Sequence, residues 1–92
     1  MNTAIDADDG NPALRGLALK GIQAWRARLC RIVEAGVKAG EIRKRTEPRR
    51  VANTIIATLE GALMISRLER SKDALRDAQA MLNGVLDEIS TV

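Results

Sequence analysis

The sequence predicts an all-α protein made of three helices. Three runs carry apolar residues at three- and four-residue spacing, and no run alternates as a half-buried strand does. Hydrophobic residues make up 46% of the chain, yet they include one Trp and no Phe or Tyr. A core of Leu, Ile, Val, Ala and Met favours close-packed helices over sandwiches and barrels. A single domain of 92 residues is small, and a second copy is the easiest way to stabilise it.

The first predicted helix begins at Pro12, after a leader over residues 1–11 without periodicity. Asn11 can cap this helix with its side-chain oxygen, and a proline in the first turn loses no hydrogen bond. Gly40 is the predicted stop, because glycine readily adopts the left-handed conformation that closes a helix. We therefore divide the chain into a leader, residues 1–11, and one domain, residues 12–92. The apolar face of the first helix consists of Leu14, Ala18, Ile22, Trp25, Leu29, Ile32 and Val33.

The second helix is predicted over residues 48–70, with Thr46 as its cap and Glu47 at the positive end of its dipole. Apolar or small residues cover most of its circumference, which predicts contacts on more than one side. The third helix is predicted over residues 72–90, with Ser71 as its cap. Its clean apolar face consists of Leu75, Ala78, Leu82, Val85 and Ile89.

Several kinds of chemistry are excluded by composition. The chain has no His, which removes histidine bases, Ser-His-Asp and Cys-His arrangements and histidine metal ligands. Cys30 stands alone and is expected to act as a small buried hydrophobe. We predict no catalytic residue, no cofactor and no metal site, and therefore no enzyme. Cys30 is unpaired, the chain has no signal-peptide pattern, and no apolar run approaches the ~20 residues of a bilayer span. These features predict a cytoplasmic protein without membrane contact.

Two surface features suggest partners. The broad apolar arc of the second helix would be partly exposed in a lone three-helix unit, which soluble monomers avoid on a large scale. Alternatively, that helix is simply central in a monomer, or its arc is a docking site for another protein. A basic cluster could attract nucleic acid, or could be only a solvated loop and helix start. The cluster consists of Arg43, Lys44, Arg45, Arg49 and Arg50.

The order of these signals resembles the C-terminal regulatory domain of TetR-family transcriptional regulators. The similar parts are the helix running into "RLCRIVEAGVKAGEIR", the segment "TEPRRVANTIIATLEGALMISRLER" and the amphipathic closing helix. Within them lie a GxxxGE-hydrophobe turn (Gly36 to Ile42) and the "EGAL" of residues 60–63. The resemblance covers most of residues 13–90. It lacks the N-terminal helix-turn-helix half, so we expect DNA contact only through a domain absent from this chain.

The resemblance implies that the last two helices pack against their twins in a dimeric four-helix bundle. It also implies that the helix carrying Trp25 lines part of a pocket for a small hydrophobic effector. On the faces described above, the homodimer interface is expected at Ile55, Leu59, Ala62, Leu63, Ser66, Leu75, Ala78, Leu82, Val85 and Ile89. The effector pocket is expected at Ile22, Trp25, Leu29 and Met64.

We therefore expect a dimerisation and partial effector-sensing domain of a bacterial TetR-type regulator, without its DNA-binding domain. Two alternatives stay open. One is a freestanding basic helical module that binds nucleic acid. The other is a helical adaptor that binds another protein.

Overall fold

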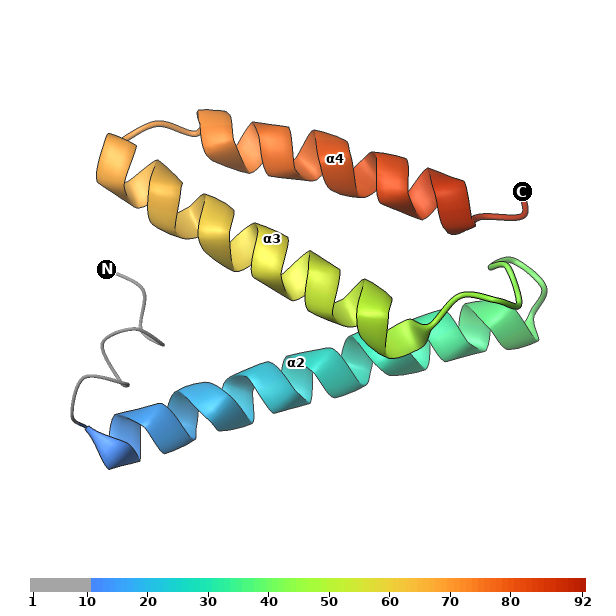
Figure 1. Ribbon diagram of the computed structural model, residues 1–92, viewed down its shortest axis with the longest axis horizontal. Coiled ribbons are helices and arrows are strands. Elements are labelled where there is room, and N and C mark those ends of the chain that lie inside the picture. Colours follow the sequence, from blue (N-terminus) through green and yellow to red (C-terminus); the bar gives the residue numbers. More distant parts are fainter. Residues whose placement is uncertain (1–10) are drawn as a thin grey trace.

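The computed structural model describes residues 11–92 and shows three helices (Figure 1). Within these residues no strand forms, and the extended pairing is limited to an isolated antiparallel bridge between Ile42 and Ser90. The predicted all-α class and the number of helices are therefore confirmed, with helix ends within one or two residues of those predicted. The helices are α2 (Pro12–Lys38), α3 (Pro48–Glu69) and α4 (Asp73–Ile89).

The ends of α2 follow the predicted signals. Asn11 Oδ1 accepts a hydrogen bond from the backbone N–H of Leu14 at 3.0 Å, and Pro12 occupies the first turn. The chain leaves the helix through Gly40, whose φ of 79° lies in the left-handed region that glycine adopts without a Cβ penalty. The capping role of Asn11 and the stop at Gly40 are confirmed. The rest of the predicted leader lies outside the described residues.

The predicted cap of α3 is wrong. Glu47, not Thr46, is the residue that precedes the first turn, and no side chain caps this helix. The backbone N–H of Thr46 donates to Arg43 O at 3.0 Å, so Thr46 belongs to the turn that leads into the helix. Pro48 in the first turn has no N–H, which removes one of the amides that a cap would otherwise satisfy.

The turn between α3 and α4 closes at Arg70, which has a left-handed φ of 52°. The backbone N–H of Ser71 donates to Ser66 O at 3.1 Å and so satisfies a carbonyl at the end of α3. Ser71 Oγ accepts from the backbone N–H of Asp73 at 3.1 Å. Ser71 thus satisfies the first amide of α4, but the predicted cap position is wrong by one residue, because Lys72 directly precedes α4 and its side chain makes no capping bond.

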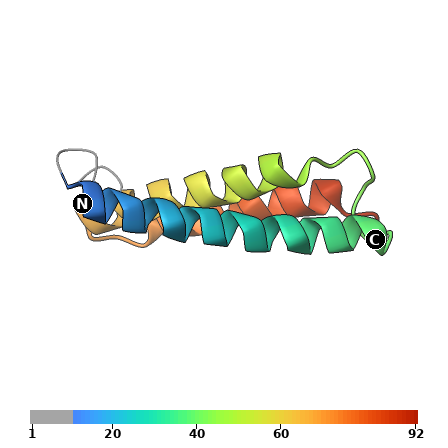
Figure 2. The same ribbon diagram turned by 90° about the horizontal axis from the view of Figure 1, so that it is seen from below.

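The three helices form a flat arrangement when seen edge-on (Figure 2), and α3 lies between α2 and α4 (Figure 1). α3 packs on α2 and on α4, whereas α2 and α4 do not contact each other. The Cα atoms extend over 44 × 30 × 14 Å. The radius of gyration is 15.2 Å, against about 12 Å for a compact domain of this length. The described chain is therefore an open unit without a second layer of helices to close its core.

Few side chains are buried, and α3 supplies most of those that are. Among the described residues no large side chain is less than 2% exposed. Ala52 is 0% exposed, and its small size lets α3 approach its neighbours closely. The buried apolar residues are Val33 of α2, Val51, Ala52, Ile56 and Ala62 of α3, and Ala78 and Leu82 of α4.

The expectation that no apolar run approaches the length of a bilayer span needs correction. α3 has 22 residues and a mean hydropathy of 1.2 in its most apolar window, which is enough to cross a membrane by length and composition alone. A core helix in a soluble protein meets the same criterion. α3 lies between the other two helices and supplies four of the seven buried apolar residues, and 22% of its most apolar window is buried within this chain.

Candidate functional site

The largest unpartnered apolar feature of α3 is a stripe along its length. Its members recur at four-, three- and one-residue steps, which places them on one side of the helix. Ile65 is 43% exposed and Leu68 is 70% exposed, and a Cβ atom built on Gly61 would meet nothing within 4 Å. Because small residues lie beside large exposed ones, a second helix could approach this side closely. We call this surface the open α3 stripe; it consists of Ala57, Gly61, Met64, Ile65 and Leu68.

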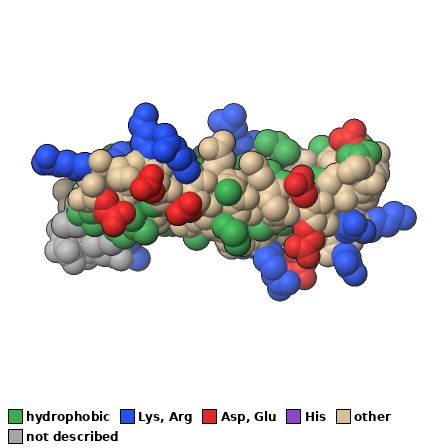
Figure 3. Space-filling view, turned by 90° about the horizontal axis from the view of Figure 1, so that it is seen from above, with side chains coloured by type: hydrophobic (Ala, Val, Ile, Leu, Met, Phe, Trp, Pro, Cys, Tyr) green, Lys and Arg blue, Asp and Glu red, His purple; other side chains and the backbone are tan. Residues whose placement is uncertain are grey.

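α4 adds two exposed apolar side chains at the flanks of its inner face. Met81 is 71% exposed and Leu86 is 44% exposed. The outer side of α4 is charged instead: Arg76 pairs weakly with Asp73 at 3.9 Å, and both side chains are at least 74% exposed. Figure 3 shows this edge of the molecule, where acidic and basic side chains are scattered among apolar ones. Apolar surface available for association on α4 therefore lies beside its contact with α3.

Four of the ten residues predicted for a dimer interface are buried within one chain, and the other six are half-buried or exposed. Ala62, Ser66, Ala78 and Leu82 are buried between helices of the same chain, and Leu63 is 37% exposed. The other five, which are half-buried, are Ile55, Leu59, Leu75, Val85 and Ile89. Sequence reasoning missed Ile65, Leu68, Met81 and Leu86 as exposed residues. Periodicity showed that the apolar arc of α3 is wide, but it could not show which part of the arc the chain's own helices cover.

The hydroxyl of Ser66 is the one buried side-chain polar atom without a hydrogen-bond partner among the described residues. Ser66 is 9% exposed and lies near the end of α3, beside a surface hollow of about 310 Å³. That hollow is lined by Leu63, Ser66, Arg67, Arg70, Ser71, Lys72 and Leu75. Three of these seven residues belong to the predicted dimer interface, so the hollow is part of the same candidate surface.

The residues predicted for an effector pocket are half-buried. Ile22, Trp25 and Leu29 share the side of α2 that carries the buried Val33, and Met64 lies on the open α3 stripe. A second hollow, of about 250 Å³, lies near the start of α3. None of these four residues lines this hollow or the one at the α3–α4 turn. α2 also carries exposed apolar residues, which do not share one side of the helix. These are Leu17, Leu19 and Ile32, at 68%, 51% and 64% exposure.

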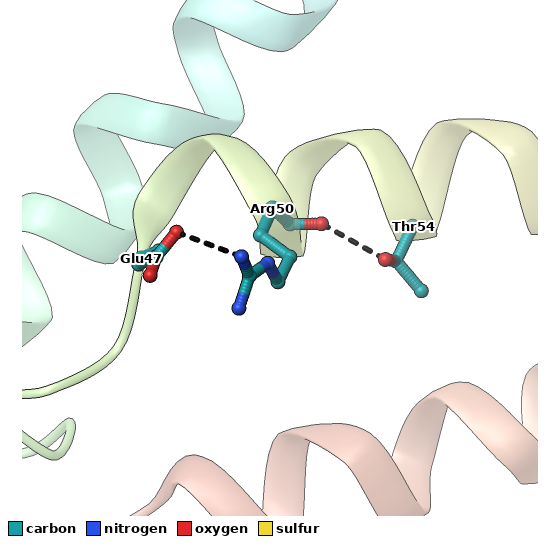
Figure 4. Close-up of polar contacts among 3 residues, drawn as sticks. All are labelled: Glu47, Arg50 and Thr54. Atoms are coloured by element: carbon teal, nitrogen blue, oxygen red, sulfur yellow. Dashed lines mark hydrogen bonds and ion pairs between the residues drawn. The ribbon is translucent and has the colours of Figure 1, made fainter.

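All five residues of the basic cluster are exposed, and two of them are engaged within the chain. The Arg50 guanidinium lies 3.3 Å from Glu47 Oε2, and Arg50 O accepts a hydrogen bond from Thr54 Oγ1 at 2.8 Å (Figure 4). Arg43 Nε donates to Glu88 O at 2.9 Å. The hollow of about 250 Å³ beside them is lined by Glu47 and Glu88 as well as by arginines. The cluster is therefore a mixed-charge surface and not a cradle for phosphate alone.

Comparisons with known proteins agree with this architecture. Residues 1–82 match the family described as the tetracyclin repressor-like C-terminal domain. The chain is 31% identical to a TetR-family transcriptional regulator from Cytophaga hutchinsonii, with a TM-score of 0.91 over 98% of this chain and 45% of that one. It is 36% identical to a TetR regulator from Chloroflexus aurantiacus J-10-FL, with a TM-score of 0.90 over 96% of this chain and 44% of that one. No curated protein matches the chain.

The chain thus spans less than half the length of these two solved structures. The matches confirm the resemblance seen in the sequence, and the family is one of transcriptional regulators, not of enzymes. This chain belongs to the tetracyclin repressor-like C-terminal domain family of TetR transcriptional regulators.

Proposed function

We propose that this chain is the dimerisation and effector-sensing part of a cytoplasmic transcriptional regulator whose DNA contacts are made by another domain. The observation that carries the proposal is the open, flat fold. Few apolar side chains are buried among the described residues, while Ile65, Leu68 and Met81 are 43%, 70% and 71% exposed. Burying apolar surface is the main favourable term in both folding and association. A second copy that covers α3 and α4 would supply the burial that one chain lacks.

The open α3 stripe is the surface best suited to the twofold contact. A symmetric dimer uses the same patch on both subunits, so small residues near the axis of symmetry benefit both helices at once. Ala57 and Gly61 provide such a position, and Ile65 and Leu68 lie one and two turns beyond it. Met81 and Leu86 lie on opposite flanks of the α4 face that contacts α3, so the flank nearer to the stripe can join the same bundle. The resulting four helices would cross at about 20°, or at about 50° where small residues permit closer contact.

Exposed apolar residues around α2 would contact the rest of the regulator. Leu17, Leu19 and Ile32 are more than half exposed, and the two matching structures have more than half of their length outside the region that this chain covers. An effector pocket would then form where Ile22, Trp25 and Leu29 meet Met64 and the additional helices. Apolar and aromatic side chains of this kind suit a small hydrophobic ligand.

DNA recognition is tested on the chain alone. We expect no sequence-selective DNA binding in a mobility-shift assay, because the proposed DNA contacts belong to another domain. The assay is run at ~0.15 M salt, where non-specific phosphate contacts are weak. The five basic residues of the cluster, changed together to Ala, provide the comparison. A selective shift that survives this salt and disappears in the Ala variant would instead establish the nucleic-acid-binding alternative. A shift that is non-selective in both proteins would leave recognition to another domain, as proposed.

A further inference from the structure

The C-terminus of the chain is fastened to the loop that follows α2. The backbone N–H of Arg43 donates to Ile89 O at 2.9 Å, and that of Thr91 donates to Glu41 O at 3.0 Å. Arg43 Nε donates to Glu88 O at 2.9 Å, and Thr91 Oγ1 donates to Gly40 O. These four hydrogen bonds flank the bridge between residues 42 and 90. We call residues 40–43 together with 88–91 the C-terminal clasp.

The clasp also reaches α2 through one side chain. A Cβ atom built on Gly36 would lie 2.8 Å from Ile42 Cγ1 and would meet Ile42 Cδ1 as well, so the Ile42 side chain lies directly on the backbone of α2. The backbone N–H groups of Glu41 and Ile42 both donate to Gly36 O, at 2.9 and 3.1 Å. Residue 36 must therefore be glycine because a side chain there would collide with Ile42, and not because its backbone adopts a left-handed φ.

The position of the clasp gives it a particular mechanical role. α2 and α4 do not contact each other, and each packs only on α3 among the helices. Arg43 satisfies the carbonyls of residues 88 and 89, which belong to the last turn of α4 and lack partners within that helix. The end of α4 is thus held by the same short segment that holds the end of α2.

We propose that the C-terminal clasp couples α2 to α4, so that a displacement of α2 at Gly36 moves the last turn of α4 without passing through α3. The coupling is a property of one chain and does not require a second copy. In the regulator proposed above it would carry a change at the effector side of α2 to the dimerisation helix α4. Packed elements with discrete contacts transmit small shifts in this way.

The test is amide hydrogen exchange of the 92-residue chain, followed residue by residue. Gly36→Ala overfills the contact with Ile42 and should raise exchange in residues 86–89 of α4 by at least about tenfold. Gly21→Ala is the matched control, since a Cβ at Gly21 meets nothing within 4 Å, and it should leave α4 unchanged. Arg43→Ala and Thr91→Pro together remove three of the four clasp hydrogen bonds and leave the one from the Arg43 backbone N–H to Ile89 O. In a chain opened in this way, Gly36→Ala should have a much smaller effect on α4.

Ile42→Ala offers an independent perturbation that needs no extra space and tests the same contact if Gly36→Ala does not fold. It should raise exchange at the end of α4 in the same way, whereas Ile32→Ala, at an exposed position of α2, should not. Two results would overturn the proposal. One is an unchanged α4 in both Gly36→Ala and Ile42→Ala. The other is a response of equal size after the clasp is opened, which would place the coupling in α3.

Discussion

Leu68→Glu is expected to dissociate the dimer while leaving each chain folded. Leu68 is 70% exposed in one chain, so its replacement disturbs no intrachain packing and the new carboxylate stays in water. In a dimer closed by the open α3 stripe, that carboxylate would be buried without a partner in both copies. Desolvating an unpaired ion costs several kcal/mol, so two of them should raise the dissociation constant by at least about a thousandfold.

Leu17→Glu is the matched control for this change. Leu17 has nearly the same exposure, 68%, carries the same side chain and lies on α2, away from the stripe. Sedimentation velocity should show a dimer for Leu17→Glu and a monomer for Leu68→Glu, with equal helical circular dichroism. A dimer in both proteins would move the interface off this stripe. Ala62 is unsuitable for the same test, because it is 6% exposed within one chain and a charge there would disrupt the fold itself.

Ile56→Ala should cause the largest loss of stability from a single side chain of α3. Ile56 is 6% exposed, and shortening a buried Ile to Ala removes burial and leaves a cavity, at a cost of about 2–5 kcal/mol. For a domain of this size, each kcal/mol lowers the melting temperature by about 4–8 °C. Thermal unfolding followed by circular dichroism, at one fixed protein concentration, should therefore show a decrease in melting temperature of at least about 8 °C.

The same truncation at an exposed isoleucine separates burial from helix propensity. Ile32 is 64% exposed on α2, and Ile32→Ala should change stability by no more than about 0.5 kcal/mol. Equal melting temperatures for Ile56→Ala and Ile32→Ala would show that the contacts around Ile56 do not hold α3 in place.

Local sequence features were sufficient to predict most of the fold. Asn11, Pro12 and Gly40 each act through their own backbone and side-chain chemistry, so their roles could be read without knowing the neighbours. Thr46 was misassigned as a cap because it and Glu47 both precede Pro48, and the choice between them depends on the turn from Arg43. The pairing of Ile42 with Ser90 joins residues far apart in sequence, and nothing in the local pattern predicted it.

The candidate site was harder to predict, because a helix with apolar residues around most of its circumference does not show which side its own chain covers. The sequence favoured the side of Ala62 and Ser66, which the structure buries within one chain. The opposite side, with Gly61 and Leu68, is left open. That choice follows from how α2 and α4 cross α3, which is a tertiary property.

The most direct measurement of the central claim is the molar mass of the unmodified chain in solution. Light scattering on the eluting peak of a size-exclusion column gives this mass without assuming a shape, which suits a molecule of 44 × 30 × 14 Å. A chain of 10.0 kDa that completes its core with a second copy should elute at 2 × 10.0 = 20.0 kDa. A folded, helical species of 10.0 kDa at all concentrations would contradict the claim, because the exposed stripe would then need no partner.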